Sequence, residues 1–226
     1  MDFSFMSRYG FFFIEGAKNT IILAALTVLF GFIIGILLAL MRLAKNPVLK
    51  AVSAAYIEFI RGTPLLVQVY LIVYGLPSLG IVIPDFPLLG DDFPRFIGAV
   101  VALSINSGAY VAEIIRAGIQ AVDKGQMEAA RSLGMPHWLA MRHIILPQAF
   151  KNILPALGNE FIVVIKESSI VSVIGIGEIM FKANAIRGKT FLAFEPLIVA
   201  ALIYFTLTFS LSKLLGVAER RMRAGD

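Results

Sequence analysis

The sequence predicts an all-helical membrane protein with five transmembrane helices. Of its 226 residues, 58% are hydrophobic and only 15% are charged, whereas a soluble domain is roughly 45–50% apolar and about 25% charged. This apolar content excludes a disordered chain and argues against a water-soluble enzyme. The net charge of +5 is explained more simply by basic loops beside anionic lipid than by nucleic acid.

The first predicted helix covers residues 20–41, a run of 22 residues without a charged side chain. A membrane span needs about 20 apolar residues. The hydrophobic part of a secretory signal is only about 7–15 residues long, and no small-x-small cleavage site follows here. The run therefore predicts a retained transmembrane helix.

Four further apolar runs complete the predicted set. They cover residues 62–84, 96–112, 153–176 and 191–211. The segment between the third and fourth runs, residues 113–151, is too charged to span a membrane. We therefore expect a single transmembrane domain over residues 1–226, with no separate soluble domain.

The distribution of Lys and Arg predicts the orientation. The first and third loops and the C-terminal tail hold 13 of these residues, whereas the N-terminal tail and the second and fourth loops hold 6. Because basic loops stay in the cytoplasm, the N-terminus is expected outside and the C-terminus inside. The fourth loop is discordant, since it carries Lys182, Arg187 and Lys189 on the expected outer side.

The third loop, residues 118–150, holds a predicted short helix over residues 126–133. Gly134 follows as a plausible stop, with Pro136 two residues beyond,. Ala129 and Ala130 are small enough for close approach to another protein, and charged neighbours can fix the orientation. The alternative is an amphipathic helix lying on the membrane surface.

The same loop carries a spaced motif. Glu128-Ala129-Ala130 is followed after three residues by Gly134, and after nine more by Ile144-x-Leu146-Pro147. This pattern resembles the EAA loop of ATP-binding-cassette importer permeases. Residues 58–77 and 109–134, and the opening Glu15–Gly35 segment, are similar to the polar amino-acid subfamily of these permeases.

The resemblance implies the partners. Glu128, Ala129, Ala130 and Gly134 are expected to form a coupling helix that docks into a separate cytoplasmic ATPase. ATP and Mg²⁺ would be bound by that ATPase, with no cofactor and no catalytic residue in this chain. A second permease copy or a paralogue, an extracytoplasmic solute-binding protein and a bacterial cytoplasmic membrane are also implied.

Polar residues within the predicted spans are candidates for substrate binding. Glu160 is costly in a membrane and is expected to face the bundle interior. We predict that it binds the side chain of a basic amino acid, arginine first, then lysine or histidine. Asn106, Ser104 and Gln68 would bind the α-carboxylate and ammonium groups. The structural alternative is pairing of Glu160 with Lys166 or another helix, and interhelical hydrogen bonding by the neutral residues.

Two alternatives for function stay open. One is a permease for glutamine or glutamate. The other is an ion-coupled transporter or channel without an ATPase, in which Glu160, Lys166 and Glu167 relay protons.

Other motifs carry less weight. Residues 183–190 nearly match a phosphate-binding loop, but Ala183 replaces its first glycine and the segment lies in a predicted outer loop,. His137 and His143 lack the spacing and the carboxylate neighbours of a metal site, so no metal is expected. Gly31 and Gly35 form a G-x-x-x-G pattern that favours close helix packing.

Overall fold

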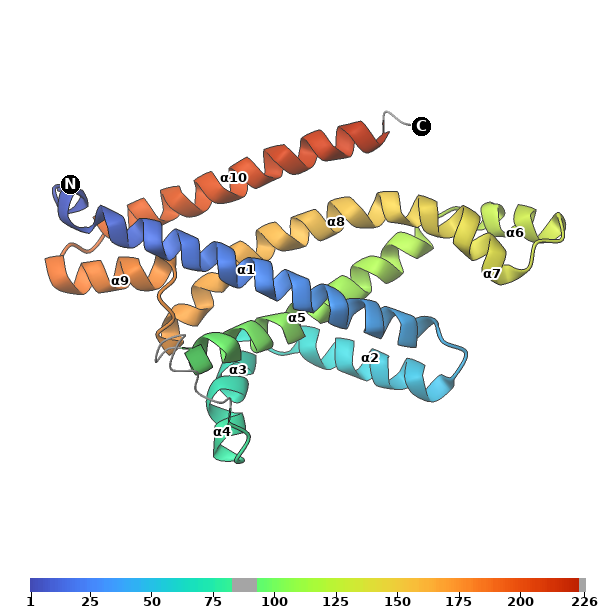
Figure 1. Cartoon of the computed structure of the whole chain (residues 1–226), viewed down its shortest axis with the longest axis horizontal. Helices are drawn as coiled ribbons and strands as arrows, with labels where there is room; N and C mark the ends of the chain where they lie inside the picture. Colours follow the sequence, from blue (N-terminus) through green and yellow to red (C-terminus); the bar gives the residue numbers. More distant parts are fainter. Residues whose placement is uncertain (83–92, 224–226) are drawn as a thin grey trace.

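The computed structural model describes residues 1–82 and 93–223, and these residues form helices joined by short connections, with no β-strand among them. The α-helices are α1 (Phe5–Leu43), α2 (Pro47–Gly62), α3 (Leu65–Tyr70), α4 (Leu76–Ser78), α5 (Phe93–Gln120), α6 (Lys124–Ser132), α7 (His137–Ala140), α8 (Leu146–Glu167), α9 (Ile179–Thr190) and α10 (Glu195–Arg223). Two π-helical turns, η1 (Leu71–Gly75) and η3 (Met141–Ile145), and a 3-10 helix, η4 (Ser168–Ile174), complete the described elements. The long helices α1, α5, α8 and α10 follow the long axis of the molecule (Figure 1).

Three described helices, α1, α5 and α10, are long and apolar enough to cross a membrane. A fourth candidate is the pair formed by α2 and the segment Leu65–Ser78, which is bent by 106°. The predicted span over residues 153–176 corresponds to α8 and η4, where charged side chains interrupt the apolar pattern. The count of five spans therefore remains a prediction, whereas the all-helical membrane class is confirmed.

The predicted span over residues 62–84 begins at the bend that follows α2. Thr63 and Pro64 are extended, with ψ angles of 145° and 134°. A residue before proline is pushed out of the helical region by the proline ring, so α2 ends at Gly62 and α3 begins at Leu65. Residues 83 and 84 of the predicted span lie outside the described residues.

Helix α5 is the centre of the bundle. Of its most apolar 18-residue window 67% is buried, compared with 11% for α10. It packs closely against α1 at the G-x-x-x-G pattern, where a Cβ atom at Gly35 would lie 2.4 Å from Val111 Cγ1. The predicted close helix contact is thus present, and any larger residue at Gly35 requires α1 and α5 to separate.

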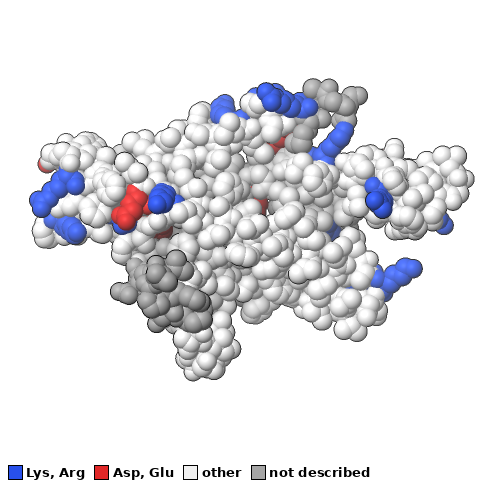
Figure 2. Space-filling model, in the orientation of Figure 1, with Lys and Arg blue, Asp and Glu red and all other residues white. Residues whose placement is uncertain are grey.

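The two ends of the molecule differ in the segments they carry. The N-terminus and α9 lie at one end in Figure 1, whereas α6, α7 and the turn between α1 and α2 lie at the other, with the end of α10 in that half. Figure 2 shows a broad area with few Lys, Arg, Asp or Glu atoms over the middle of this face. Lys and Arg side chains lie at the two ends and along the edge near the end of α10. This arrangement is what a bilayer around the middle of the bundle requires.

Candidate functional site

A buried polar cluster occupies the middle of α5. Asn106 Nδ2 donates a hydrogen bond to Gln68 Oε1 at 3.0 Å, and both side chains are only 6% exposed. Gln68 Nε2 in turn donates to Ile60 O at 2.8 Å and to Thr63 Oγ1 at 2.9 Å. Gln68 therefore joins α5 to the bend between α2 and α3, and satisfies a carbonyl group that the end of α2 leaves without a helical partner.

Glu160 lies on α8 against the same part of α5. Its side chain is 7% exposed, and its Oε1 accepts a hydrogen bond of 2.8 Å from Ser107 Oγ. Within residues 1–82 and 93–223 no Lys or Arg lies within ion-pair distance of this carboxylate. The expected alternative partner, Lys166, is exposed and does not pair with it. Glu160 is thus a buried carboxylate held by a neutral donor.

The four predicted substrate residues divide into separate contacts. Gln68 and Asn106 bind each other, Glu160 binds Ser107, and Ser104 Oγ donates to Thr27 O at 3.4 Å on α1. The Gln68 amide and the Glu160 carboxylate are therefore bound by two adjacent residues of α5, Asn106 and Ser107. Ser104 faces α1 and serves helix packing in this structure.

Ser107 is the residue of this cluster that the sequence reasoning does not select. A Cβ atom at Gly31 would lie 3.0 Å from Ser107 Cβ and 3.1 Å from its Oγ. The absence of a side chain at Gly31 therefore lets α1 approach and leaves Ser107 room to point towards α8. The signal in the sequence is the position of Ser107 beside Asn106 in the same apolar run.

The predicted loop helix is α6. Asp123 Oδ1 accepts a hydrogen bond from the Gly125 backbone N–H at 2.6 Å and caps its start. Gly134 follows its end with φ at +83°, and the Met135 N–H donates to Ala130 O at 3.1 Å. Glycine reaches this left-handed conformation without the penalty that a Cβ atom imposes. The helix therefore ends just before Gly134, as predicted, and the left-handed backbone conformation of this glycine turns the chain away.

Helix α6 exposes only part of its motif. Glu128 and Ala129 are exposed, whereas Ala130 is 2% exposed and packs inward. Leu133, just beyond the helix, is 84% exposed. The exposed surface of α6 thus combines a carboxylate, a small residue and an apolar side chain, and Ala130 supports the helix from below.

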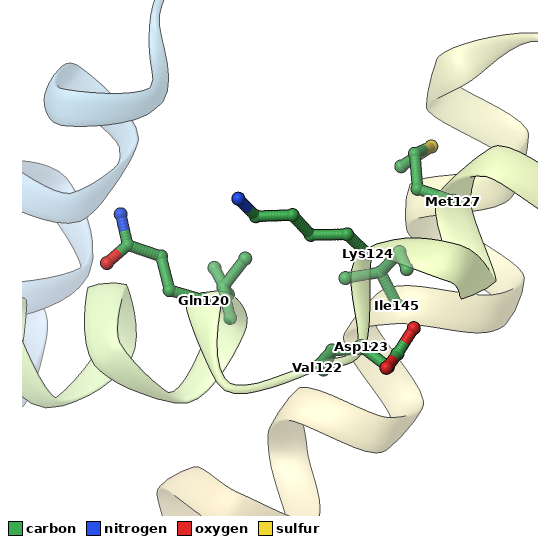
Figure 3. Close-up of a pocket in the computed structure, with 7 residues that line it drawn as sticks. Gln120, Val122, Asp123, Lys124, Met127 and Ile145 are labelled. Atoms are coloured by element: carbon green, nitrogen blue, oxygen red, sulfur yellow. The ribbon is translucent and has the colours of Figure 1, made fainter.

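An open cavity of about 540 Å³ lies where α5 meets α6. Figure 3 shows Lys124 extending across it towards Gln120, with Met127 and Ile145 on its other side. The Asp123 carboxylate lies at the start of α6, where its hydrogen bond caps the helix. The cavity lies at the turn where the chain passes from the apolar helix α5 to the loop helix α6.

Two other motifs can be placed. Residues 183–190 are helical as part of α9, so their backbone N–H groups are not arranged as a phosphate-binding loop. His137 begins α7 and His143 lies in η3. In the described part of the chain, no group of three or more His, Asp or Glu residues could hold a metal ion.

Comparison with known proteins identifies the family of this chain. Residues 31–224 match the family described as binding-protein-dependent transport system inner membrane component. This chain belongs to that family. The match covers the polar cluster, α6 with its flanking loop, and α10, so it includes every candidate residue named above.

Relatives of this permease transport amino acids according to their names. It is 42% identical over 226 residues to the arginine transport system permease protein ArtQ of Bacillus subtilis, covering all of this chain and 99% of ArtQ. It is 43% identical over 211 residues to the putative glutamine transport system permease protein GlnP of Rickettsia bellii, covering 93% of each. A solved structure described as an amino acid ABC transporter with histidines matches with a TM-score of 0.90 and 53% identity, over 98% of this chain and 99% of that one.

The chain is the membrane permease subunit of an amino-acid ABC importer. ATP hydrolysis belongs to a separate subunit, and this chain is a translocation component. The family also implies a substrate-binding protein and a second permease subunit. An ion-coupled transporter or channel without an ATPase is not supported.

Proposed function

We propose that this permease imports a basic amino acid, arginine first, and that Glu160 binds the cationic side chain. The observation that carries the proposal is a carboxylate that is 7% exposed and is bound only by the neutral Ser107 hydroxyl among the described residues. A carboxylate in an apolar interior requires a cation or several donors. A guanidinium group can supply both, through two parallel N–H donors.

Asn106 supports recognition of the amino-acid backbone. Its Nδ2 is used by Gln68, but its Oδ1 makes no hydrogen bond among the described residues and can accept one from a substrate ammonium group. The amide of Gln68 already braces the bend between α2 and α3, so we assign Gln68 a positioning role. Ser104 would reach a substrate carboxylate only by giving up its 3.4 Å bond to Thr27 O.

The second candidate substrate class is glutamine or glutamate. The relatives named for arginine and for glutamine are 42% and 43% identical to this chain, so their names do not separate the two classes. The buried carboxylate favours a cationic substrate over glutamate, because two carboxylates in one apolar site repel each other.

A thermal-shift screen tests this specificity. The permease–ATPase assembly, without the binding protein, is heated with each of the twenty amino acids. A ligand at 100 times its dissociation constant adds about 2.7 kcal/mol of stability. We expect arginine to raise the melting temperature most, followed by lysine and histidine, with alanine as the unresponsive control. A larger shift with glutamine than with arginine would contradict basic specificity.

We further infer that α6 is the coupling helix. Glu128 and Ala129 would contact the ATPase directly, Ala130 would support them from beneath, and Gly134 would set the exit of the chain. ATP and Mg²⁺ would be held by that ATPase. The exposed side of α6 and its position at one end of the bundle support this assignment.

We also propose five spans in a bacterial cytoplasmic membrane, with the N-terminus outside and the C-terminus inside. The placement of α6 and the α1–α2 turn at one end of the molecule, opposite α9, supports the alternation that this topology needs. The solute-binding protein would then deliver substrate at the end that carries α9.

A further inference from the structure

A row of polar and exposed residues continues along α5 from Asn106 towards α6. Tyr110, Glu113, Ala117 and Gln120 follow Asn106 at intervals of four, three, four and three residues, so the five residues share one face of the helix. Asn106 is 6% exposed and Tyr110 is 37% exposed, and both Ala117 and Gln120 are exposed. The face therefore opens progressively towards the end of α5 that leads into α6 (Figure 1).

Two arginines of this chain already occupy groups on this face that suit a guanidinium. Arg61 of α2 places its Cζ 5.4 Å from the centre of the Tyr110 ring. Arg116 donates from Nε to Glu113 Oε1 at 2.9 Å, and from Nη2 to the same oxygen. Aromatic faces and carboxylates are both favourable partners of guanidinium groups. The face thus offers an aromatic ring and a carboxylate, one helical turn apart, each bound by an internal arginine.

The contact between Arg116 and Glu113 can be exchanged at little cost. Their side chains are 31% and 23% exposed, and ion pairs three residues apart on an exposed helix surface contribute little to stability. Among residues 1–82 and 93–223, none donates a hydrogen bond to Glu113 Oε2, so the carboxylate keeps an open acceptor. Arg116 Nη1 also donates to Gln120 Oε1 at 2.5 Å, and this contact can hold Arg116 when it leaves Glu113.

We propose that Tyr110 and Glu113 form a second site for the guanidinium group of the substrate, on the α6 side of Asn106, and that Arg61 and Arg116 fill this site when no substrate is there. The proposal rests on the proposed function, because it requires a basic substrate. Glu113 lies seven residues from Asn106, which is two helical turns or about 10 Å along α5. A substrate released from the cluster around Glu160 and Asn106 would reach Glu113 next.

The surroundings of Glu113 favour a short stay of the substrate. The positive charges of Arg61 and Arg42 act on this carboxylate in addition to that of Arg116. Three arginines therefore surround one acidic group, and like charges repel a cation that arrives there. The returning guanidinium of Arg116 would compete directly for the carboxylate and release the substrate.

Binding of radiolabelled arginine to the purified permease–ATPase assembly tests the second site. All variants carry Glu160→Gln, so that the first cationic site is removed. Adding Arg116→Gln leaves Glu113 unoccupied and should tighten arginine binding at least about tenfold, because an internal competitor is lost. Adding Glu113→Gln as well should cancel the gain. An unchanged affinity in Arg116→Gln, or a gain that survives Glu113→Gln, would overturn the proposal.

Two controls keep the result specific to this contact. Lys124→Gln, at an exposed position at the start of α6, removes one cation as Arg116→Gln does, and should change arginine affinity less than about twofold, since exposed distant charges are screened. Where Arg116→Gln fails to assemble, Arg116→Lys keeps the charge but loses the planar fork of donors. It should still bind arginine more tightly than its parent, and no gain would overturn the proposal.

Small probes test which group is recognised. Ethylguanidinium should displace labelled arginine from the Glu160→Gln, Arg116→Gln variant, whereas ethylurea, which is neutral and similar in shape, should not. Equal displacement by the two compounds would contradict a guanidinium site. Tyr110→Leu in the same variant removes the aromatic face and should weaken arginine binding about threefold or more. Unchanged binding would remove Tyr110 from the site.

Transport by the natural chain separates this proposal from the proposed function. Arginine uptake by the natural chain without any gain of binding in Arg116→Gln would leave the substrate assignment standing and remove the second site. A gain that depends on Glu113, in a protein whose natural form imports only glutamine, would keep the guanidinium site and remove arginine as the natural substrate.

Discussion

Ser107 connects helix packing with the candidate binding carboxylate. It is 1% exposed, lies against Gly31 of α1, and donates a 2.8 Å hydrogen bond to Glu160 of α8. Its chain neighbour Asn106 binds Gln68 beyond the bend after α2. Two consecutive residues of α5 therefore hold polar groups from two different helices, and the position of Glu160 depends on a small hydroxyl.

This arrangement predicts that Ser107→Ala weakens the response to arginine. A hydrogen bond to a charged group contributes about 1.5–3 kcal/mol, so the arginine concentration that half-stimulates ATP hydrolysis should rise about tenfold or more. Ser104→Ala is the matched control, because it removes a hydroxyl from the same helix whose bond to Thr27 O is 3.4 Å long. Equal effects of the two variants would contradict the special role of Ser107.

At the scale of elements, α6 depends on the conformation of one glycine. Gly134 has φ at +83°, and a Cβ atom added there would meet no other atom within 4 Å, so a side chain is strained by the backbone and not by a clash. The next residue, Met135, returns a hydrogen bond to Ala130 O and accepts one from Arg131 Nη1 at 2.9 Å. A shifted exit from α6 would therefore move the surface that we assign to the ATPase.

We expect Gly134→Asp to abolish substrate-stimulated ATP hydrolysis while the permease still inserts into the membrane. Gly134→Asn should be milder, since asparagine tolerates the left-handed conformation better and adds no charge. Gly188→Ala, at an open position in α9, is the control for changing a glycine. Insertion is followed by membrane fractionation and coupling by ATPase assay. Full stimulation in Gly134→Asp would refute docking through α6.

The same elements show how far sequence reasoning reaches. The helix predicted over residues 126–133 is observed at Lys124–Ser132, because capping by Asp123 and the stop at Gly134 are local effects. The cost of Glu160 in an apolar run predicts its burial, but not its contact with Ser107. That contact depends on how α1, α5 and α8 rotate against one another, which no local pattern specifies.

The bend after α2 escapes prediction for a different reason. The run over residues 62–84 contains no charged side chain, so its composition indicates a single span, although Pro64 is visible as a helix break. Hydropathy reports which residues avoid water, whereas the direction of the chain depends on backbone torsion angles. The hydrogen bonds that Gln68 donates at the bend stabilise this change of direction in the chain.

In the whole molecule, α6 can reach a cytoplasmic ATPase only if the two ends of the bundle face opposite compartments. Lys124→Cys on α6 and Ala185→Cys on α9 place single thiols at exposed positions at opposite ends of the bundle. We expect an impermeant maleimide to label Ala185→Cys in intact cells, and to label Lys124→Cys only after permeabilisation. The reverse pattern would invert the topology and remove α6 from the cytoplasm.

Transport by a reconstituted assembly tests whether Glu160 selects a basic amino acid. Proteoliposomes containing the permease and its ATPase, with ATP inside and the binding protein outside, are supplied with arginine or glutamine. We predict faster arginine uptake by the natural chain. Glu160→Gln, which removes the charge and keeps the shape, should lose most arginine uptake while basal ATP hydrolysis persists. Faster glutamine uptake by the natural chain, or normal arginine uptake by Glu160→Gln, would contradict the account.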